Sequence, residues 1–273
     1  MTILLATLLV GGFAGTVGAL LGVGGGLFLV PFLNRVLGLP FSVASGVSLV
    51  TIIATSIASS AARGRLQVVN LRLAMVLEVF TVGGAIAAIS VFATRTDEAL
   101  RLPFAWTMVA IAVVVASRLD RRNIIADASI DVGWLGGRYR EAESGGVVSY
   151  RLKRAPVAVV MSFLAGVVSQ FGIGGGVMVV PALNTWCGVP IRVAAATSSF
   201  MLGVTALAGA AHSFLRGDVS PELAAAAVLG VLAGTQVGVR LGVSVPAKTQ
   251  KILMIGLLLT VWVIYFFDLK AHR

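Results

Sequence analysis

The sequence predicts an all-α polytopic membrane protein made of two repeats, each with four full spans and a short broken or re-entrant helix. Hydrophobic residues make up 58% of the chain and charged residues only 12%, whereas a soluble domain carries about 25% charged residues. A glycine-rich stretch occurs twice, and the one sizeable polar stretch lies near the middle of the chain. Lipid is therefore the expected surrounding of most of the chain.

The duplicated stretch occupies residues 22–40 and 172–190, which align without gaps at an offset of 150 and are identical at ten of nineteen positions. Each copy interrupts an apolar run with three consecutive glycines and a proline. Paired segments of this kind, in corresponding halves of a chain, point to the substrate site of a secondary transporter. The duplication therefore predicts both an architecture and the position of a site.

Eight apolar runs are long enough to cross a bilayer, which takes about 20 residues. The first run has no basic segment before it and continues past signal-peptide length, so we expect a membrane helix and not a cleaved signal. The segments 27–38 and 177–188 are too short to cross straight, and they predict half-helices that are buried in protein or line a cavity. The eight predicted spans are 3–21, 41–62, 71–93, 102–118, 155–171, 191–214, 221–242 and 247–267.

A polar central loop divides the chain into a first transmembrane repeat (1–118), the loop itself (119–154) and a second transmembrane repeat (155–273). Within the loop, two runs with Tyr and Val flank a Ser-Gly-Gly turn and predict a small β-hairpin over 134–153. The loop is basic, so the positive-inside rule places it in the cytoplasm of a multi-pass protein of the cell inner membrane. If the short segments help to complete membrane crossings, the two repeats are inverted; if they are re-entrant, the repeats are parallel. We favour the inverted form.

The glycine turns suggest an anion site. A turn followed by a short helix exposes backbone N–H groups without partners inside the helix, and the helix dipole adds positive potential there. Glycine lets a ligand approach this backbone closely. Two such helix starts that face each other would hold a small oxyanion without a buried arginine, although glycine turns also serve to pack helices. The candidate backbone groups belong to Gly24, Gly25, Gly26, Gly174, Gly175 and Gly176.

Polar side chains near the turns are candidates to complete such a site. Hydroxyl groups donate hydrogen bonds to anions, although Ser and Thr in membrane helices also bond to the carbonyl one turn earlier. The asparagine that follows each turn either caps the short helix or lines the path. The candidate substrate-binding side chains are Ser48, Thr197, Ser198, Gln170, Asn34 and Asn184.

Ionisable side chains within the predicted spans are few. Such a group inside a membrane is a functional candidate by default, and proton coupling requires one. Glu78 and His212 are the two candidates, and neither has a counterpart in the other half. His212 lies close to a helix end, where it can reach water.

Several functions are excluded or disfavoured. The chain has no HExxH motif, Walker loop or GxSxG elbow, so we do not expect an enzyme. A single cysteine, Cys187, excludes a cysteine-based metal cage, and we expect no cofactor or metal. The net charge of +10 resides in short loops between apolar runs, which argues against a nucleic-acid partner. The expected partners are a small anionic substrate and the bilayer, and a homodimer stays open.

The motifs resemble those of the TauE/SafE family of sulfite exporters, which are small anion transporters with four plus four helices. The resemblance covers nearly the whole chain and implies export or uptake of sulfite, sulfoacetate or a related sulfur-containing anion by alternating access. A non-transporting membrane subunit that scaffolds a partner complex is the alternative, although a scaffold has no need of paired broken helices. The resemblance rests on GVGGG (22–26), GIGGG (172–176), VPALN (180–184), AATSS (195–199), RGDV (216–219) and LAGTQVGVR (232–240).

Overall fold

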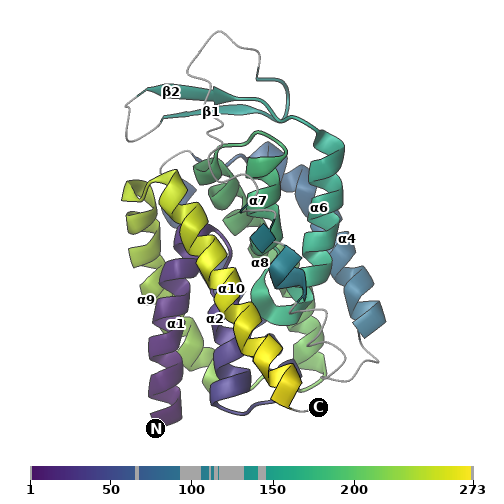
Figure 1. The fold of residues 1–273 in the computed structure, drawn as a ribbon, viewed down its shortest axis with the longest axis vertical. Coiled ribbons are helices and arrows are strands. Elements are labelled where there is room, and N and C mark those ends of the chain that lie inside the picture. The colour runs from purple at the N-terminus through teal and green to yellow at the C-terminus, as the bar shows by residue number, and fades with distance from the viewer. Residues whose placement is uncertain are drawn as a thin grey trace.

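Helices make up most of the structure, and a two-stranded sheet crosses one end of the helix bundle (Figure 1). Within the described residues, six helices are long and apolar enough to cross a membrane. The polytopic helical class predicted from composition is therefore confirmed. The computed structural model describes residues 2–64, 68–92, 106–110, 112–113, 116, 132–140 and 146–271.

The described residues from 2 to 92 form three long helices and one short broken helix. Gly22 (φ +74°) and Gly24 (φ +83°) separate the first long helix from the short one, because glycine adopts this left-handed conformation without a steric penalty. The short helix widens into a π-helical turn after Pro31, whose ring removes a backbone donor. The elements are α1 (Thr2–Leu21), α2 (Gly26–Pro31), η1 (Phe32–Val36), α3 (Phe41–Gly64) and α4 (Leu71–Phe92).

The second half again has a long helix, a glycine turn and a short helix, and three long helices follow. Gly172 (φ +76°) and Gly174 (φ +79°) are left-handed at the positions equivalent to Gly22 and Gly24. Here the π-helical turn comes before the short helix and includes Gly172, and the short helix runs through Pro181 without a break. The elements are α6 (Ala155–Val168), η2 (Ser169–Ile173), α7 (Gly176–Thr185), α8 (Ile191–Leu215), α9 (Pro221–Ser244) and α10 (Ala247–Ala271).

Six of the eight predicted spans are helices long and apolar enough to cross a membrane. The six candidate spans are α1, α3, α4, α6 with η2, α8 and α9, and the run predicted at 247–267 is helical as part of α10. The described residues within the run 102–118 are helical, and the rest of that run lies outside the described residues. The two short predicted segments are short helices.

The two halves pack by exchanging partners. The first helix of each half lies against the fourth helix of the other, so α1 contacts α9 and α6 contacts α4, while α3 contacts α8. Glycine permits the close approach, because a Cβ on Gly15 would collide with the carbonyl of Val231 and one on Gly166 with the carbonyl of Thr81. Each half therefore completes the other and does not form a separate bundle.

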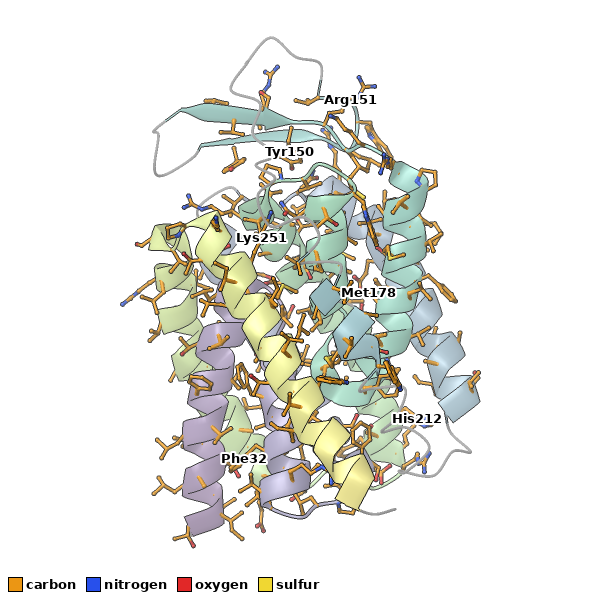
Figure 2. All side chains as sticks on the ribbon, viewed as in Figure 1. Phe32, Tyr150, Arg151, Met178, His212 and Lys251 are labelled. Carbon is orange, nitrogen blue, oxygen red and sulfur yellow. The ribbon has the colours of Figure 1, made fainter. Side chains whose placement is uncertain are left out.

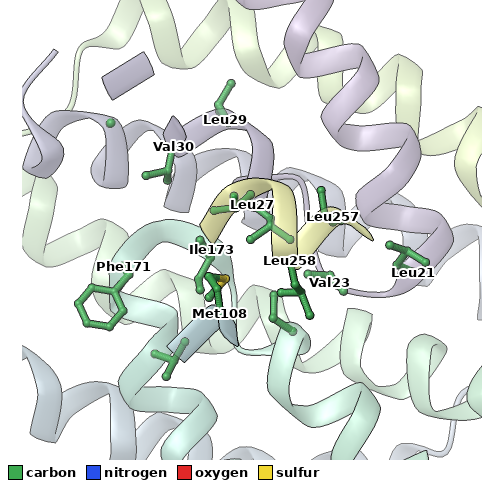
Figure 3. Close-up of a cluster of buried hydrophobic side chains, with 14 of the residues drawn as sticks. Leu21, Val23, Leu27, Leu29, Val30, Met108, Phe171, Ile173, Leu257 and Leu258 are labelled. Carbon is green, nitrogen blue, oxygen red and sulfur yellow. The ribbon is translucent and has the colours of Figure 1, made fainter. Parts of the chain in front are cut away.

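A large buried apolar cluster lies around the glycine turns and draws on both halves (Figure 3). The cluster includes Leu27 at the start of α2 and Ile173 in the second turn. It also includes Leu258 of α10, and Met108. All four side chains are almost completely buried. This core fixes the position of the two turns within the bundle.

The predicted hairpin is confirmed. Strand β1 (Gly137–Arg140) pairs antiparallel with β2 (Val147–Tyr150), and the pair lies across one end of the bundle (Figure 1). An isolated two-stranded hairpin is only marginally stable. This one gains support from its inner face, where Tyr139, Val148 and Tyr150 are buried in the second apolar cluster.

The helices of the two halves run in different directions. Figure 1 shows α1 starting from the N-terminus at the end of the bundle opposite the hairpin, whereas α6 starts beside the hairpin. The last helix, α10, ends at the same end of the bundle as the N-terminus.

Candidate functional site

The two glycine turns meet at the centre of the bundle. A Cβ on Gly26 would collide with the carbonyl of Gly172, and a Cβ on Gly176 would collide with the carbonyl of Gly22. Each short helix therefore begins directly against the turn of the other half, and the four residues are related by the offset of 150. This close contact explains why a residue without a side chain is required at the start of both helices.

The middle glycines of the turns face two apolar side chains. The Cβ positions of Gly24 and Gly174 both lie within van der Waals distance of Ile52 and Leu202, which come from the paired helices α3 and α8. All residues from 22 to 26 and from 172 to 176 are buried. In this structure the turns are therefore sealed on the side that faces α3 and α8.

The aligned serines Ser48 and Ser198 lie beside the starts of the short helices but make different contacts. The Ser48 hydroxyl donates a hydrogen bond of 2.5 Å to the carbonyl of Gly172. The Ser198 Oγ lies 2.8 Å from the Cβ position of Gly176 and has no hydrogen-bond partner among the described residues, although Ser198 is only 1% exposed. A buried hydroxyl normally has a hydrogen-bond partner. Ser198 is therefore the serine of this pair that could still donate to a ligand.

The second short helix supplies donors next to this hydroxyl. Gly175 is the N-cap residue of α7 and provides no side-chain cap, so the first N–H groups of the helix have no partner within it. The helix is ten residues long, and its dipole adds positive potential at this end. Together with Ser198, these N–H groups form a buried cluster of hydrogen-bond donors.

Thr197 and Gln170 extend the polar surroundings of the second turn. The Thr197 hydroxyl accepts a hydrogen bond of 3.1 Å from the backbone N–H of Asn70. The side-chain amide of Gln170 donates to the hydroxyl of Ser169 at 3.2 Å, and its carbonyl oxygen lies against Gly209 of α8. Ser45 fixes the backbone here, since its hydroxyl donates to the carbonyl of Gln170 at 2.9 Å.

Asn34 and Asn184 hold the far ends of the short helices. The Asn34 amide donates to the carbonyl of Leu39 at 2.7 Å, and the Asn184 amide donates to the carbonyl of Val189 at 2.9 Å. Both bonds tie the last turn of a short helix to the connection that leads into the next long helix. Of the two roles open to these residues, the contacts therefore favour capping.

Glu78 belongs to a separate polar cluster between α4 and α8. The Thr205 hydroxyl donates to Glu78 Oε1 at 2.7 Å and also lies 3.1 Å from the hydroxyl of Thr81. The other carboxyl oxygen, Oε2, is buried and has no hydrogen-bond partner among the described residues. The cluster has no counterpart in the other half, where Val228 and Val231 occupy the positions of Glu78 and Thr81.

His212 lies away from this cluster. It is in the last turn of α8, two turns beyond Thr205, and is half-buried. Figure 2 shows it near the end of the bundle opposite Tyr150 and Arg151 of the hairpin segment. The structure does not bring the two ionisable candidates together.

Sequence reasoning missed two residues that organise these clusters. Asn70 joins α4 to both α8 and the hairpin, and Thr205 donates to the buried carboxyl group of Glu78. Asn70 does carry a local signal, because it precedes the first residue of α4 and its side chain accepts from the N–H of Leu73 as an N-cap. Thr205 carries none, since a threonine in an apolar helix usually bonds within the helix.

Comparisons with known proteins agree with the membrane architecture. A family model described as "Sulfite exporter TauE/SafE" matches residues 7–265. The chain is also similar to a protein of Bacillus subtilis (strain 168) named "Probable membrane transporter protein YunE", with 28% identity over 249 residues, which are 88% of this chain and 89% of the relative. No solved structure gives a significant match.

Proposed function

We propose that this chain, which belongs to the sulfite exporter TauE/SafE family, is a secondary transporter that moves a small anion, sulfite or an organosulfonate, by alternating access. The observation that carries this proposal is the contact between two duplicated glycine turns beside a buried serine hydroxyl without a partner. A site built from broken helices at a repeat interface is typical of secondary transporters. A scaffold subunit would have no use for such a pair.

The two repeats are inverted with respect to the membrane in this proposal. Support comes from the opposite starting ends of α1 and α6 (Figure 1) and from the exchange of partners between halves. Inverted repeats allow one half to rock against the other around a fixed central site. The hairpin then lies in the cytoplasm of a cell inner-membrane protein, in keeping with its basic residues, and both termini lie outside.

The anion is held in the second half of the site by the first N–H groups of α7 together with the hydroxyl of Ser198. This arrangement suits an oxyanion, which accepts several hydrogen bonds and gains from the positive end of the helix dipole. In the first half, the equivalent hydroxyl of Ser48 already has a partner, because it donates to the carbonyl of Gly172. The two half-sites are therefore not equivalent, and binding is centred on residues 174–176 and 197–198, with Gln170 at their edge.

Proton coupling is assigned to Glu78. It is ionisable, lies in a spanning helix and bridges α4 to α8 through Thr205. The helix α8 also carries Ser198. A change in the charge of Glu78 would alter its bond to Thr205 and so bias the position of α8 relative to α4. His212 lies near the helix end and has the weaker claim to this role.

Flux measurements in proteoliposomes test the function directly. Purified protein is reconstituted, and uptake of labelled sulfite and labelled sulfoacetate is followed with and without a pH gradient. The expected result is saturable uptake of at least one of these anions, stimulated by the gradient and absent from protein-free vesicles. Well-folded protein that carries neither anion under any gradient would favour the scaffold alternative.

A further inference from the structure

A cavity of about 570 Å³ lies between the hairpin and the helix bundle. Its walls come from three parts of the chain: the connection 68–72 that leads into α4, the hairpin segment, and Val193 of α8. The size falls within the range of about 300–1,000 Å³ found for small-molecule sites. The cavity is separate from the glycine turns, which are buried deeper in the bundle.

The polar groups of this cavity are suited to an anion. Arg72 from the first turn of α4 and Arg138 from β1 both line it, together with Asn70 and Tyr150. Every charged residue in the described segments 68–72, 132–140 and 146–154 is basic. Guanidinium groups bind carboxylate, sulfonate and phosphate oxygens with paired hydrogen bonds.

One wall of the cavity is linked through α8 to the candidate site. Val193 lines the cavity and lies one helical turn before Thr197 on α8. The Thr197 hydroxyl accepts from the backbone N–H of Asn70, which lines the same cavity. The next residue is Ser198, whose buried hydroxyl has no hydrogen-bond partner in the part of the chain that the structure describes. The bond between Asn70 and Thr197 thus links the wall of the cavity to the residue next to Ser198.

We propose that this cavity is an anion-binding vestibule, in which Arg72 and Arg138 hold the acidic group of a small organic anion before it reaches Ser198. That the bound anion is the transported one rests on the proposed function, whereas the binding itself does not. The cavity has room for a carbon skeleton beyond the acidic group, and Val68 and Tyr139 give it apolar contacts. An organosulfonate or a similar organic acid therefore fits better than bare sulfite. The phosphate of a lipid headgroup presents the same chemistry, and the experiment separates the two.

The local charge of the cavity can be measured without transport. Val69→Cys, in a Cys187→Ala background and in phosphatidylcholine nanodiscs, places a thiol in the cavity wall. Its rate of modification is compared for an anionic and a cationic methanethiosulfonate reagent. We expect the anionic reagent to react faster with the parent thiol. The double change Arg72→Gln with Arg138→Gln should lower the ratio of the anionic to the cationic modification rate by about tenfold at low salt. Arg240→Gln removes a charge near the end of α9, outside the cavity, and should leave the ratio unchanged.

Protection by ligand completes the test. Sulfoacetate should slow modification of the thiol in the parent and much less in the double arginine variant. Val132→Cys, on the hairpin side of the cavity, is the second reporter if the first does not fold. The proposal would be overturned if the double arginine change left the ratio of anionic to cationic modification rates unchanged. It would also be overturned if the thiol were protected only when anionic lipid is added. If the parent protein shows the expected ratio of modification rates and the expected protection but carries no anion, only the proposed transport function is contradicted.

Discussion

Two serines at equivalent positions play different parts in this molecule. The Ser48 hydroxyl donates to the carbonyl of Gly172 in the second turn, so it already has a hydrogen-bond partner within the protein. Ser198 is equally buried and has no hydrogen-bond partner within the described residues. An orphaned buried hydroxyl costs about 1–3 kcal/mol, and a ligand that accepts from it would recover this energy. The asymmetry therefore makes Ser198 the informative residue to change.

Ser198→Ala should weaken anion binding by about tenfold or more, since a charge-assisted hydrogen bond contributes roughly 1.5–3 kcal/mol. The folded protein should be at least as stable as the parent, because the change removes a buried hydroxyl without a partner and no internal hydrogen bond. Ser199→Ala is the matched control, since the Ser199 hydroxyl bonds back to the carbonyl of Ala195 at 2.8 Å. The concentration for half-maximal sulfite or sulfoacetate flux, at equal reconstituted amounts, is the measurement. Equal values for Ser198→Ala and the parent would remove Ser198 from the site.

Glycine substitutions at the second turn are poor probes of ligand contact. A Cβ on Gly175 would lie only 2.8 Å from the carbonyl oxygen of Ala165, so a Gly175→Val variant would disturb the packing of α7 on α6. Its loss of transport would follow from this collision whether or not an anion binds there. Sequence alone does not distinguish this packing constraint from a binding role, because both require the same small residue.

Glu78→Gln should abolish the stimulation of flux by a pH gradient while anion exchange at equal pH continues. The amide keeps the shape of the side chain and still accepts from Thr205, but it cannot change charge. Thr205→Val is the companion variant, because it removes the donor to Glu78 Oε1 and leaves the titratable group in place. The measurement is uptake of labelled anion with an imposed gradient compared with counterflow at uniform pH. Full gradient stimulation in Glu78→Gln would assign coupling to another group.

At the scale of elements, Asn70 anchors the hairpin to the bundle. Its side-chain amide donates to the carbonyl of Leu135 at 3.0 Å and to the hydroxyl of Tyr150 at 2.9 Å, and its carbonyl oxygen caps α4. Burial raises the pKa of the Tyr150 phenol, and the bond from Asn70 opposes this shift. One residue therefore serves as a helix cap and as the joint between two elements.

Asn70→Asp should release the hairpin with little effect on α4, because the carboxylate keeps the cap but loses the donors. Asn70→Ala should lose both, at a cost of about 2–4 kcal/mol for the cap and the donated bonds. Limited proteolysis with trypsin, which cleaves after basic residues such as Arg151, reports release of the hairpin. The unfolding temperature reports the loss of the cap. Unchanged cleavage in both variants would show that the apolar face alone holds the hairpin.

The hairpin and the joint that holds it differ in how far the sequence could predict them. The hairpin follows from a Ser-Gly-Gly turn between two Tyr- and Val-bearing runs, which is local information. The joint depends on contacts between Asn70 and residues that lie 65 and 127 positions further along the chain. No local pattern encodes such pairs. The same holds for Glu78, whose position in a span is visible in the sequence, whereas its donor on α8 is not.

On the scale of the whole molecule, the repeat was visible because its motif recurs at one fixed offset. The exchange of partners between halves was not, since periodicity identifies the buried face of a helix but not which helix covers it. The glycines that allow α1 to approach α9, and α6 to approach α4, could equally have served packing within each half. Only the three-dimensional arrangement shows that the core is shared.

The proposed inverted arrangement makes a topological prediction that a parallel arrangement does not. Single cysteines are introduced in a Cys187→Ala background at Trp134, which is 68% exposed beside the hairpin, and at Leu215, which is 85% exposed at the end of α8. In intact cells, a membrane-impermeant maleimide should label Leu215→Cys from outside, and Trp134→Cys should react only after the membrane is opened. The same reagent should label Thr2→Cys from outside, since α1 starts at the end of the bundle opposite the hairpin (Figure 1). Labelling of Trp134→Cys and Thr2→Cys from the same side would contradict the inverted arrangement and, with it, rocking of one half against the other around the glycine turns.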